Sequence, residues 1–153
     1  MLRSTSMVKS MWPGVSIRLM RRIAVREMYD TYADGANRMD RETWLSAWAD
    51  DAVWKTHYFE VTGRAAIAAK YDELMAAVSA TTFLTQICSI EVDGDSARAS
   101  AIGQERLMMP GGSFRLTGLN QDRLVRRTGR WQILRRDYHV SVEEAPGVGE
   151  VAG

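Results

Sequence analysis

The spacing of hydrophobic residues changes once along the chain, near residue 80. Before that point apolar residues recur every three to four positions, which is typical of helices with one buried face. The pattern predicts a helix over residues 17–36, a second short helix after Asp40, and a third helix from Gly63 to about Val78. Asp40 suits a helix N-cap, because its carboxylate can accept hydrogen bonds from the first backbone amides.

Beyond residue 80 the pattern becomes that of β-strands. Four segments rich in β-branched residues are separated by turns that contain glycine. These segments are 81–92, 96–108, 114–127 and 130–142. A shorter strand is expected over 52–56, directly after the second helix. Helices first and consecutive strands afterwards predict an α+β fold, with three helices packed on one face of a strongly curved, mostly antiparallel sheet.

Strand alternation gives each side chain an expected direction. Leu124, Trp131 and Ile133 are expected on the core side of the last two strands. Asp122 shares the parity of Leu124, and His139 shares that of Trp131 and Ile133. Both polar residues are therefore expected to point inward.

Length and composition indicate a single domain. The chain has 153 residues, of which 46% are hydrophobic and 25% are charged, as is ordinary for a globular protein. The expected domain spans 17–142, between a disordered leader at 1–16 and an acidic, Gly-rich disordered tail at 143–153. No apolar run approaches the ~20 residues of a transmembrane helix, so no membrane partner is expected. The lone Cys88 gives no disulfide framework and fits a reducing cytoplasm.

Charge and motif content exclude several classes of partner. A net charge of +1 gives no general attraction to nucleic acid. His57 and His139 are far apart and have no carboxylate at ligand spacing, so no metal site is expected. No glycine-rich phosphate loop precedes a helix, so no organic cofactor is expected either.

Two segments carry a resemblance to a known fold. They are YADGANRMDRETWLSAWADDAV at 32–53 and DRLVRRTGRWQILRRDYHV at 122–140. Together they resemble the nuclear transport factor 2-like fold in its SnoaL-like branch, and the resemblance covers about 17–142. It implies a cone-shaped α+β barrel whose open mouth takes a small apolar ligand.

The ketosteroid isomerases of this fold imply roles for two residues. Tyr32 resembles their oxyanion-stabilising tyrosine, whose phenol donates a hydrogen bond to a developing enolate. Asp122 resembles their second donor, an acid kept protonated by apolar surroundings; a surface carboxylate paired with Arg123 or Arg135 is the alternative. Their general base falls on Thr56, which cannot take a proton from carbon, so His57 and His139 are the candidate bases.

Other enzymes that this fold resembles use an Asp–His pair. The aspartate of scytalone dehydratases and dehydrochlorinases falls near Asn37 here, and their first histidine near Thr82. The second dehydratase histidine falls near Ala101. Since none of the three is retained, a dehydratase or dehydrochlorinase of that mechanism is not expected.

The walls of the expected cone combine wide apolar side chains with a few polar ones. The residues expected to bind substrate are Trp48, Trp54, Thr56, Tyr58, Tyr71, Met75, Leu84, Gln86, Ile102, Gln104, Met108 and Asn120. Such a lining suits a small aromatic, terpenoid, steroid or polyketide ligand. The alternative is that these side chains fill the cone and leave no cavity.

These features predict an enzyme that acts on an apolar carbonyl or cyclic metabolite. The expected reaction is that of an isomerase, cyclase or lyase that works by enolate stabilisation without a cofactor. A non-catalytic ligand-binding or dimerisation module is the alternative. A structural protein that resembles the β subunits of aromatic-ring dioxygenases is a third possibility. A homodimer is expected in each case, because the outer face of such a sheet is often apolar.

Overall fold

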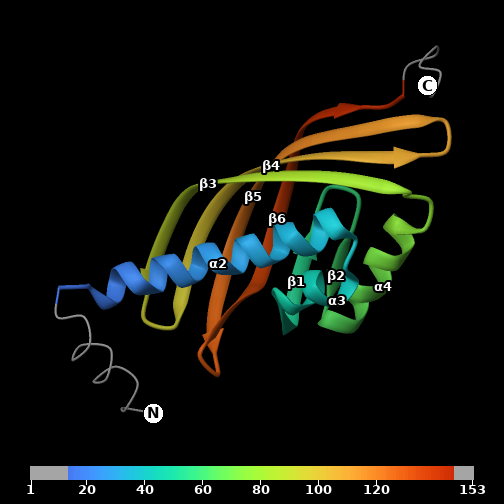
Figure 1. The fold of residues 1–153 in the computed structure, drawn as a ribbon. Coiled ribbons are helices and arrows are strands. Elements are labelled where there is room, and N and C mark those ends of the chain that lie inside the picture. Colours follow the sequence, from blue (N-terminus) through green and yellow to red (C-terminus); the bar gives the residue numbers. More distant parts are fainter. Residues whose placement is uncertain (1–13, 147–153) are drawn as a thin grey trace.

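The computed structural model describes residues 14–146, which form three helices and six strands (Figure 1). The helices are α2 (Ile17–Arg38), α3 (Arg41–Ser46) and α4 (Arg64–Met75). The strands are β1 (Trp48–Lys55), β2 (Glu60–Thr62), β3 (Ala80–Asp93), β4 (Ser96–Met109), β5 (Gly112–Arg127) and β6 (Arg130–Glu144).

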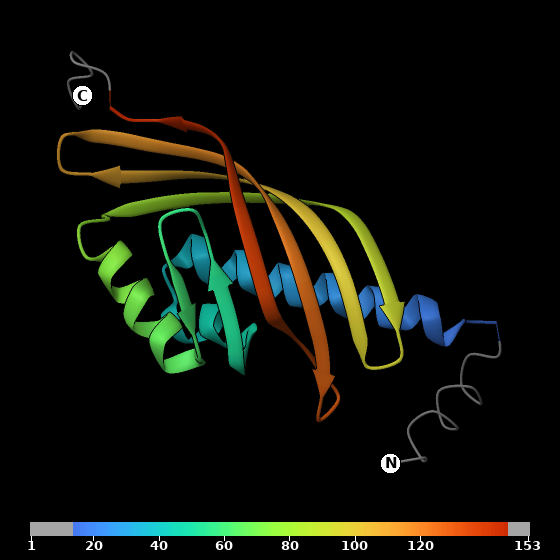
Figure 2. The same ribbon diagram turned by 180° about the vertical axis from the view of Figure 1, so that it is seen from behind.

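The six strands form one curled, unclosed sheet in the order β2-β1-β6-β5-β4-β3. Neighbouring strands are antiparallel except β1 and β6, which run parallel. Helix α2 lies across one face of the sheet, and α3 and α4 gather at one end of it (Figure 1). Figure 2 shows the other face, with the strands in front of the helices. The prediction of an α+β fold with helices on one face of a curved sheet is confirmed.

Local signals in the sequence fix the ends of the helices. The Ser16 hydroxyl caps α2 by accepting a hydrogen bond from the backbone amide of Arg18 at 3.2 Å. Asp40 caps α3 as predicted, accepting from the Thr43 backbone amide at 3.1 Å. Helix α3 ends at Ser46, so β1 begins at Trp48, four residues before the expected start of that strand.

The core lies between α2 and the inner face of the sheet. Its largest fully buried side chains are Trp48, Tyr29, Ile67, Leu124, Ile133 and Val25. Full burial of an aliphatic side chain contributes roughly 1.5–3 kcal/mol, so this cluster is a main source of stability. Leu124, Trp131 and Ile133 face inward as predicted.

Three one-residue bulges interrupt the long strands. Cys88 on β3 has no partner residue on β4, and Leu134 and Ser141 on β6 have none on β5. A bulge adds one residue to one strand only, so the side chains that follow it change faces. The direction of a residue in these strands therefore depends on which side of the bulge it lies.

The bulge at Leu134 makes one of our predictions wrong. Alternation from Ile133 placed His139 on the inner face, together with Arg135 and Asp137. In the structure Arg136 is buried, with 2% of its surface exposed, and Tyr138 and Val140 also face inward. His139 is exposed.

The inward direction predicted for parts of β3 and β4 is also wrong. Leu84 and Ile102 are 62% and 45% exposed, and Gln86 and Gln104 are exposed as well. On β3 the cause is the bulge at Cys88, which separates the inward parity of Ile90 from that of the first half of the strand. On β4 the inner face carries small residues, so large side chains were a poor guide to burial. The inner-face residues of β4 are Ala97, Ala99, Ala101, Gly103, Glu105 and Leu107.

The described chain extends slightly beyond the expected domain. Strand β6 continues to Glu144, two residues past the expected end at Val142. The leader and tail predicted to be disordered otherwise fall mainly on 1–13 and 147–153, which lie outside the described residues. None of the helices in the described range is both long enough and apolar enough to cross a membrane.

Candidate functional site

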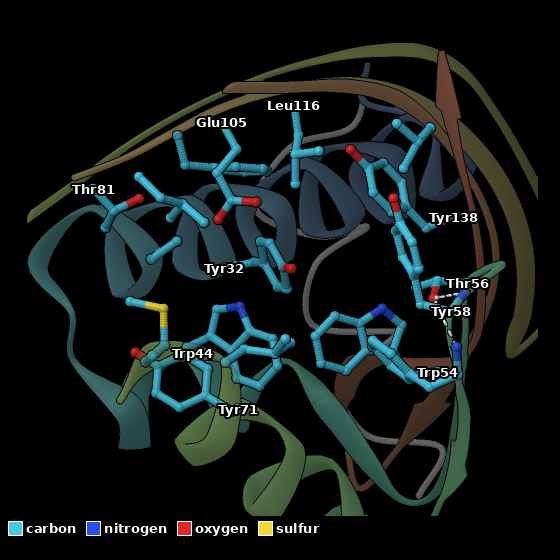
Figure 3. A pocket seen from close by; sticks show the side chains of 17 residues that line it. Tyr32, Trp44, Trp54, Thr56, Tyr58, Tyr71, Thr81, Glu105, Leu116 and Tyr138 are labelled. Atoms are coloured by element: carbon cyan, nitrogen blue, oxygen red, sulfur yellow. Dashed lines mark hydrogen bonds between the residues drawn. The ribbon is translucent and has the colours of Figure 1, made fainter. Parts of the chain in front are cut away.

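A cavity opens at the end of the sheet where α3 and α4 lie, with a volume of about 150 Å³ (Figure 3). Each helix contributes to its wall, and so do the end of β1, the turn after it and the four long strands. The lining residues are Tyr32, Ala36, Trp44, Trp54, Thr56, Tyr58, Phe59, Tyr71, Leu74, Met75, Thr81, Phe83, Glu105, Leu107, Leu116, Tyr138 and Val140. Most of this surface is apolar.

Eight of the lining residues are aromatic, and we call them the aromatic cage. They are Tyr32, Trp44, Trp54, Tyr58, Phe59, Tyr71, Phe83 and Tyr138. Their rings pack against one another: the ring centres of Trp44 and Tyr71 are 4.7 Å apart, and those of Tyr32 and Trp44 are 5.5 Å apart. Tilted contacts at such distances are favourable for aromatic pairs, so the cage walls support each other.

Glu105 is the only charged residue among the described residues that line the cavity. Figure 3 shows its carboxylate pointing from β4 into the space above Tyr32 and Trp44. Within residues 14–146 its side chain makes no hydrogen bond or ion pair that would stabilise the charge. Burial therefore raises the pKa of the Glu105 carboxyl from 4.5 to about 7. A carboxyl with such a pKa exchanges protons readily near neutral pH.

Two phenols share the cavity with Glu105. Burial is the main cause that raises the pKa of Tyr32, and burial also raises the pKa of Tyr138 to about 12. Both phenols therefore stay protonated and can donate a hydrogen bond to a ligand. A Cβ at Gly118 would overlap the Tyr138 ring, so the glycine leaves the room that this ring occupies.

A buried ion pair lies behind Tyr32. The Arg136 guanidinium donates two hydrogen bonds to the Asp122 carboxylate, at 2.9 and 2.7 Å, and the Tyr29 hydroxyl donates a third at 2.5 Å. Asp122 and Arg136 are 3% and 2% exposed. The guanidinium carbon lies 4.6 Å from the centre of the Tyr32 ring, and the positive charge lowers the pKa of Tyr32 against the larger effect of burial. A cation in this position favours negative charge on or beside the Tyr32 phenol.

The cavity brings together six of the predicted site residues. These are Tyr32, Trp54, Thr56, Tyr58, Tyr71 and Met75. Trp48 lies behind them in the core with no exposed surface, and its ring packs on those of Tyr32 and Trp54. Asn120 is buried on the inner face of β5 but does not line the cavity, and Met108 does not line it either. Leu84, Gln86, Ile102 and Gln104 lie on the outer face, as described above.

The other predicted catalytic residues lie apart from the cavity. His57 is exposed in the turn after β1, where its ring stacks on Tyr58 at 3.7 Å between centres. His139 is exposed on the outer face of β6. Both oxygens of Asp122 accept hydrogen bonds within the ion pair, so a role as a hydrogen-bond donor has no geometric support. The alternative of a surface carboxylate is wrong as well, since Asp122 is buried and its partner is Arg136, not Arg123 or Arg135.

Glu105 and Tyr138 are the ionisable lining residues that the sequence analysis missed, and it also missed the cage residues Trp44, Phe59 and Phe83. For Glu105 a signal was present, because the small residues Ala97, Ala99, Ala101 and Gly103 share its strand parity and mark the buried face. For Tyr138 we find no such signal, since its direction depends on the bulge at Leu134.

The positions of the dehydratase pair have other contacts in this chain. The Asn37 side chain accepts a hydrogen bond from the Phe83 backbone amide and donates one to the Phe83 carbonyl, both at 2.8 Å, which ties α2 to β3. Thr82 is exposed and Ala101 is fully buried. In the described part of the chain, no group of three or more His, Cys, Asp or Glu residues could hold a metal ion.

We compared the sequence and the structure of this chain with those of known proteins. A search of curated protein sequences finds no match. A putative scytalone dehydratase from Novosphingobium aromaticivorans superposes with a TM-score of 0.76 and 19% identity, over 88% of this chain and 97% of that one. A type 2 hexachlorocyclohexane dehydrochlorinase (LinA) gives a TM-score of 0.78 and 18% identity, over 89% and 95% of the two chains.

A third solved structure has a different description. A putative aromatic ring hydroxylase from Novosphingobium aromaticivorans gives a TM-score of 0.77 and 17% identity, over 84% of this chain and 95% of that one. At these identities the likeness concerns the fold, and it confirms the nuclear transport factor 2-like architecture expected from the sequence. The sequence profile of the SnoaL-like domain matches residues 18–137, most of the chain. This chain therefore belongs to the SnoaL-like domain family.

Proposed function

We propose that this chain is a small-molecule enzyme in which Glu105 takes a proton from a carbon atom next to a carbonyl group. The observation that carries the proposal is a carboxyl with a pKa of about 7 that faces an apolar cavity without a partner in the described chain. Near neutral pH such a group is ionised in part of the molecules and is a stronger base than an exposed carboxylate. This proposal replaces His57 and His139, which lie outside the cavity, as the proton acceptor.

Tyr32 is the residue best placed to stabilise the resulting enolate. The negative charge of the enolate develops on the carbonyl oxygen, where a neutral phenol can donate a hydrogen bond. The Arg136 guanidinium behind the Tyr32 ring supports this charge without being consumed by the reaction. Return of the proton from Glu105 to a different carbon gives isomerisation. If the bond from the β carbon to a leaving group breaks instead, the leaving group departs with the electron pair, a carbon–carbon double bond forms, and Glu105 releases its proton to the leaving group or to water. Neither reaction needs an oxidant, a reductant or a cofactor.

The size of the cavity limits the substrate. A volume of about 150 Å³ is close to that of a protein cavity known to hold benzene. We therefore propose a substrate with a single ring, or an open-chain compound of similar size. A terpenoid, steroid or polyketide of several rings would have to extend through the mouth of the cavity, where Tyr58 and Leu74 are 62% and 44% exposed.

Hydrogen–deuterium exchange tests the proposal without knowledge of the natural substrate. Cyclic ketones and enones of one ring are incubated with the protein in deuterated buffer, and exchange at the carbon next to the carbonyl is followed by NMR. We expect exchange above the buffer rate in the wild type and a loss of about 10²–10⁴-fold in Glu105→Gln, the range typical of a general base. The rate should rise with pH up to about 7 and then level off, because the base must be ionised.

A matched variant controls for the change of charge. Glu91 is an exposed residue of β3 outside the cavity, so Glu91→Gln should exchange at the wild-type rate. Equal rates in Glu105→Gln and Glu91→Gln would remove Glu105 from the reaction. Binding of these ketones without any exchange would instead support the non-catalytic ligand-binding alternative, which the absence of a base at Thr56 favours.

A further inference from the structure

The walls of the cavity combine aromatic faces with a single acidic side chain. We propose that the cavity binds small organic cations that carry one quaternary or tertiary ammonium group. In the complex this group lies near Glu105 and against the rings of the aromatic cage. This inference concerns which ligands the cavity accepts, and it holds whether or not Glu105 acts as a base.

The charges around the cavity favour a cation. Glu105 is the one charged group among the described lining residues. Arg136 lies on the far side of the Tyr32 ring, where Asp122 balances its charge through two hydrogen bonds. Lys70 lies 5.1 Å from the Phe59 ring centre, outside the cavity lining, and is paired with Glu73 at 2.6 Å. An ionised Glu105 therefore gives the interior a negative potential that its neighbours do not cancel.

The aromatic residues supply the second half of the site. The face of a Trp, Tyr or Phe ring attracts a cation within about 6 Å, and the attraction is strongest where water is excluded. This protein already uses the same cluster in that way, since the Arg136 guanidinium lies 4.6 Å from the Tyr32 ring centre and 5.6 Å from that of Trp48. The cavity presents the remaining faces of the cage to a ligand.

The chemistry of the site selects an alkylated ammonium over other ions. A hard metal ion takes six or more oxygen ligands, whereas the cavity lining supplies one carboxylate. An anion such as a carboxylate or phosphate would face Glu105 without a lining cation to bind it. A tertiary or quaternary ammonium is weakly hydrated, so it loses less than a metal ion on entering an apolar cavity. A volume of about 150 Å³ leaves room for such a group with short substituents.

Binding of a cation should depend on pH through Glu105. The titratable groups that face Glu105 are Tyr71 on α4, Tyr32 on α2 and Tyr138 on β6, and the pKa of each is raised above its usual value, chiefly by burial. The phenols therefore stay neutral between about pH 6 and 8, while the carboxyl ionises. A cation prefers the ionised carboxylate, so its affinity should rise over this range. A neutral ligand that accepts a hydrogen bond from the protonated acid should show the opposite trend.

Choline and its neutral isostere test the proposal, because they differ only in the replacement of the ammonium nitrogen by carbon. Isothermal titration calorimetry with the full chain at about pH 8 should give choline at least about tenfold tighter binding than the tert-butyl isostere, which corresponds to 1.4 kcal/mol. The ratio should shrink at about pH 6. It should also fall severalfold in Glu105→Gln, which keeps only the preference due to the aromatic rings, and remain unchanged in Glu91→Gln.

One further variant tests the aromatic half of the site. Trp54→Leu keeps the carboxylate but removes an aromatic face, and it should lower the affinity for choline more than that for the isostere. Equal affinities for the two ligands in the wild type, or no binding of choline at millimolar concentration, would overturn the proposal. A cation preference that is undiminished in Glu105→Gln would overturn it too. If ketone exchange is still observed together with any of these outcomes, the proposed catalysis is retained and only the proposal of a cation site is wrong.

Discussion

Two acids on neighbouring strands, Asp122 of β5 and Glu105 of β4, have opposite surroundings. Asp122 receives hydrogen bonds from Arg136 and Tyr29 and is sealed in the core at the centre of the sheet. Glu105 faces the cavity with no such partner in the described chain, and burial raises its pKa to about 7. One carboxylate is thus held by hydrogen bonds and a counter-charge, whereas the other has neither in the described chain. The difference depends on whether a cation is buried with the carboxylate.

The two acids therefore have different effects, one on the centre of the sheet and the other on the cavity at its end. A buried carboxylate with its cation and a phenol fixes the arrangement of β5, β6 and α2 beneath the site. A buried carboxylate without a cation is destabilised in its charged form and gains from contact with a proton or a positive ligand. Tyr32 lies between the two, with the ion pair on one side and the cavity on the other.

Removing the charge of Asp122 should have the largest effect. Asp122→Asn leaves Arg136 buried without its counter-charge, which we expect to lower the free energy of unfolding by about 3–5 kcal/mol. Urea denaturation at neutral pH measures the loss. Asp137→Asn is the matched control. Asp137 pairs with Arg135 at 2.9 Å on the outer face of β6, the strand that also carries Arg136. The control should lose at most about 1 kcal/mol. Similar losses in both variants would end the distinction between the two pairs.

Removal of the Tyr32 hydroxyl should affect the reaction rather than the fold. Tyr32→Phe keeps the ring over Arg136 and should therefore preserve the fold. Because it removes one oxyanion donor, the exchange rate should fall by about 10²-fold. NMR detection of ketone exchange provides the rate, and thermal unfolding checks the fold. Tyr138→Phe is the comparison, since it removes the other phenol of the cavity. If Tyr138→Phe is the slower variant, the enolate oxygen lies on that side.

Stability should depend on pH through Glu105 in a direction opposite to that of an ordinary carboxylate. The pKa of this group is raised from 4.5 to about 7 by folding, so the folded state holds the proton more tightly than the unfolded state. The contribution is fully present below about pH 4.5 and is lost as the pH rises to about 7. The loss should amount to about 2–3 kcal/mol.

Urea denaturation of the wild type and Glu105→Gln across this pH range isolates the contribution, because other groups titrate equally in both. The difference in unfolding free energy between the two proteins should change steadily between about pH 4.5 and 7. A constant difference would mean that Glu105 ionises as readily as an exposed carboxyl.

Tyr29→Phe should give the smallest effect. Asp122 keeps both hydrogen bonds from Arg136 and loses only the one from the phenol. We expect a loss of about 1.5–2 kcal/mol in unfolding free energy, at the low end of the range for a hydrogen bond to a charged group. A loss as large as that of Asp122→Asn would show that the phenol, and not only the cation, is required to hold the carboxylate.

Features that depend on neighbouring residues were predictable from the sequence. The Asp40 cap, the helix that starts at Ile17 and the turns at Gly94 and Gly129 all follow from local chemistry. The α+β fold also follows, because three helical segments precede four long strands. The lining residues Trp54, Tyr58, Tyr71 and Met75 were predicted as wide apolar wall residues, and none of them lies on one of the four long strands.

The directions of side chains in the long strands were not predictable in the same way. A strand of fourteen or more residues keeps its alternation only while no bulge occurs, and β3 and β6 both contain bulges. A bulge arises from pairing with another strand, here the next or preceding one in the chain, so the alternation within a single strand carries little trace of it. Ile102 illustrates the remaining difficulty: it is large and apolar yet 45% exposed, whereas Ala101 beside it is fully buried.

The bulge at Leu134 keeps the inner face of β6 matched to that of β5. If Leu134 were instead paired and the alternation continued from Ile133, Arg135, Asp137 and His139 would take the inner face in place of Arg136, Tyr138 and Val140. Deletion of Leu134 should therefore leave the pairing of Asp122 with Arg136 and of Asn120 with Tyr138 unchanged. One bulged position thus allows the last strand to gain or lose a residue while the side chains that line the cavity keep their direction.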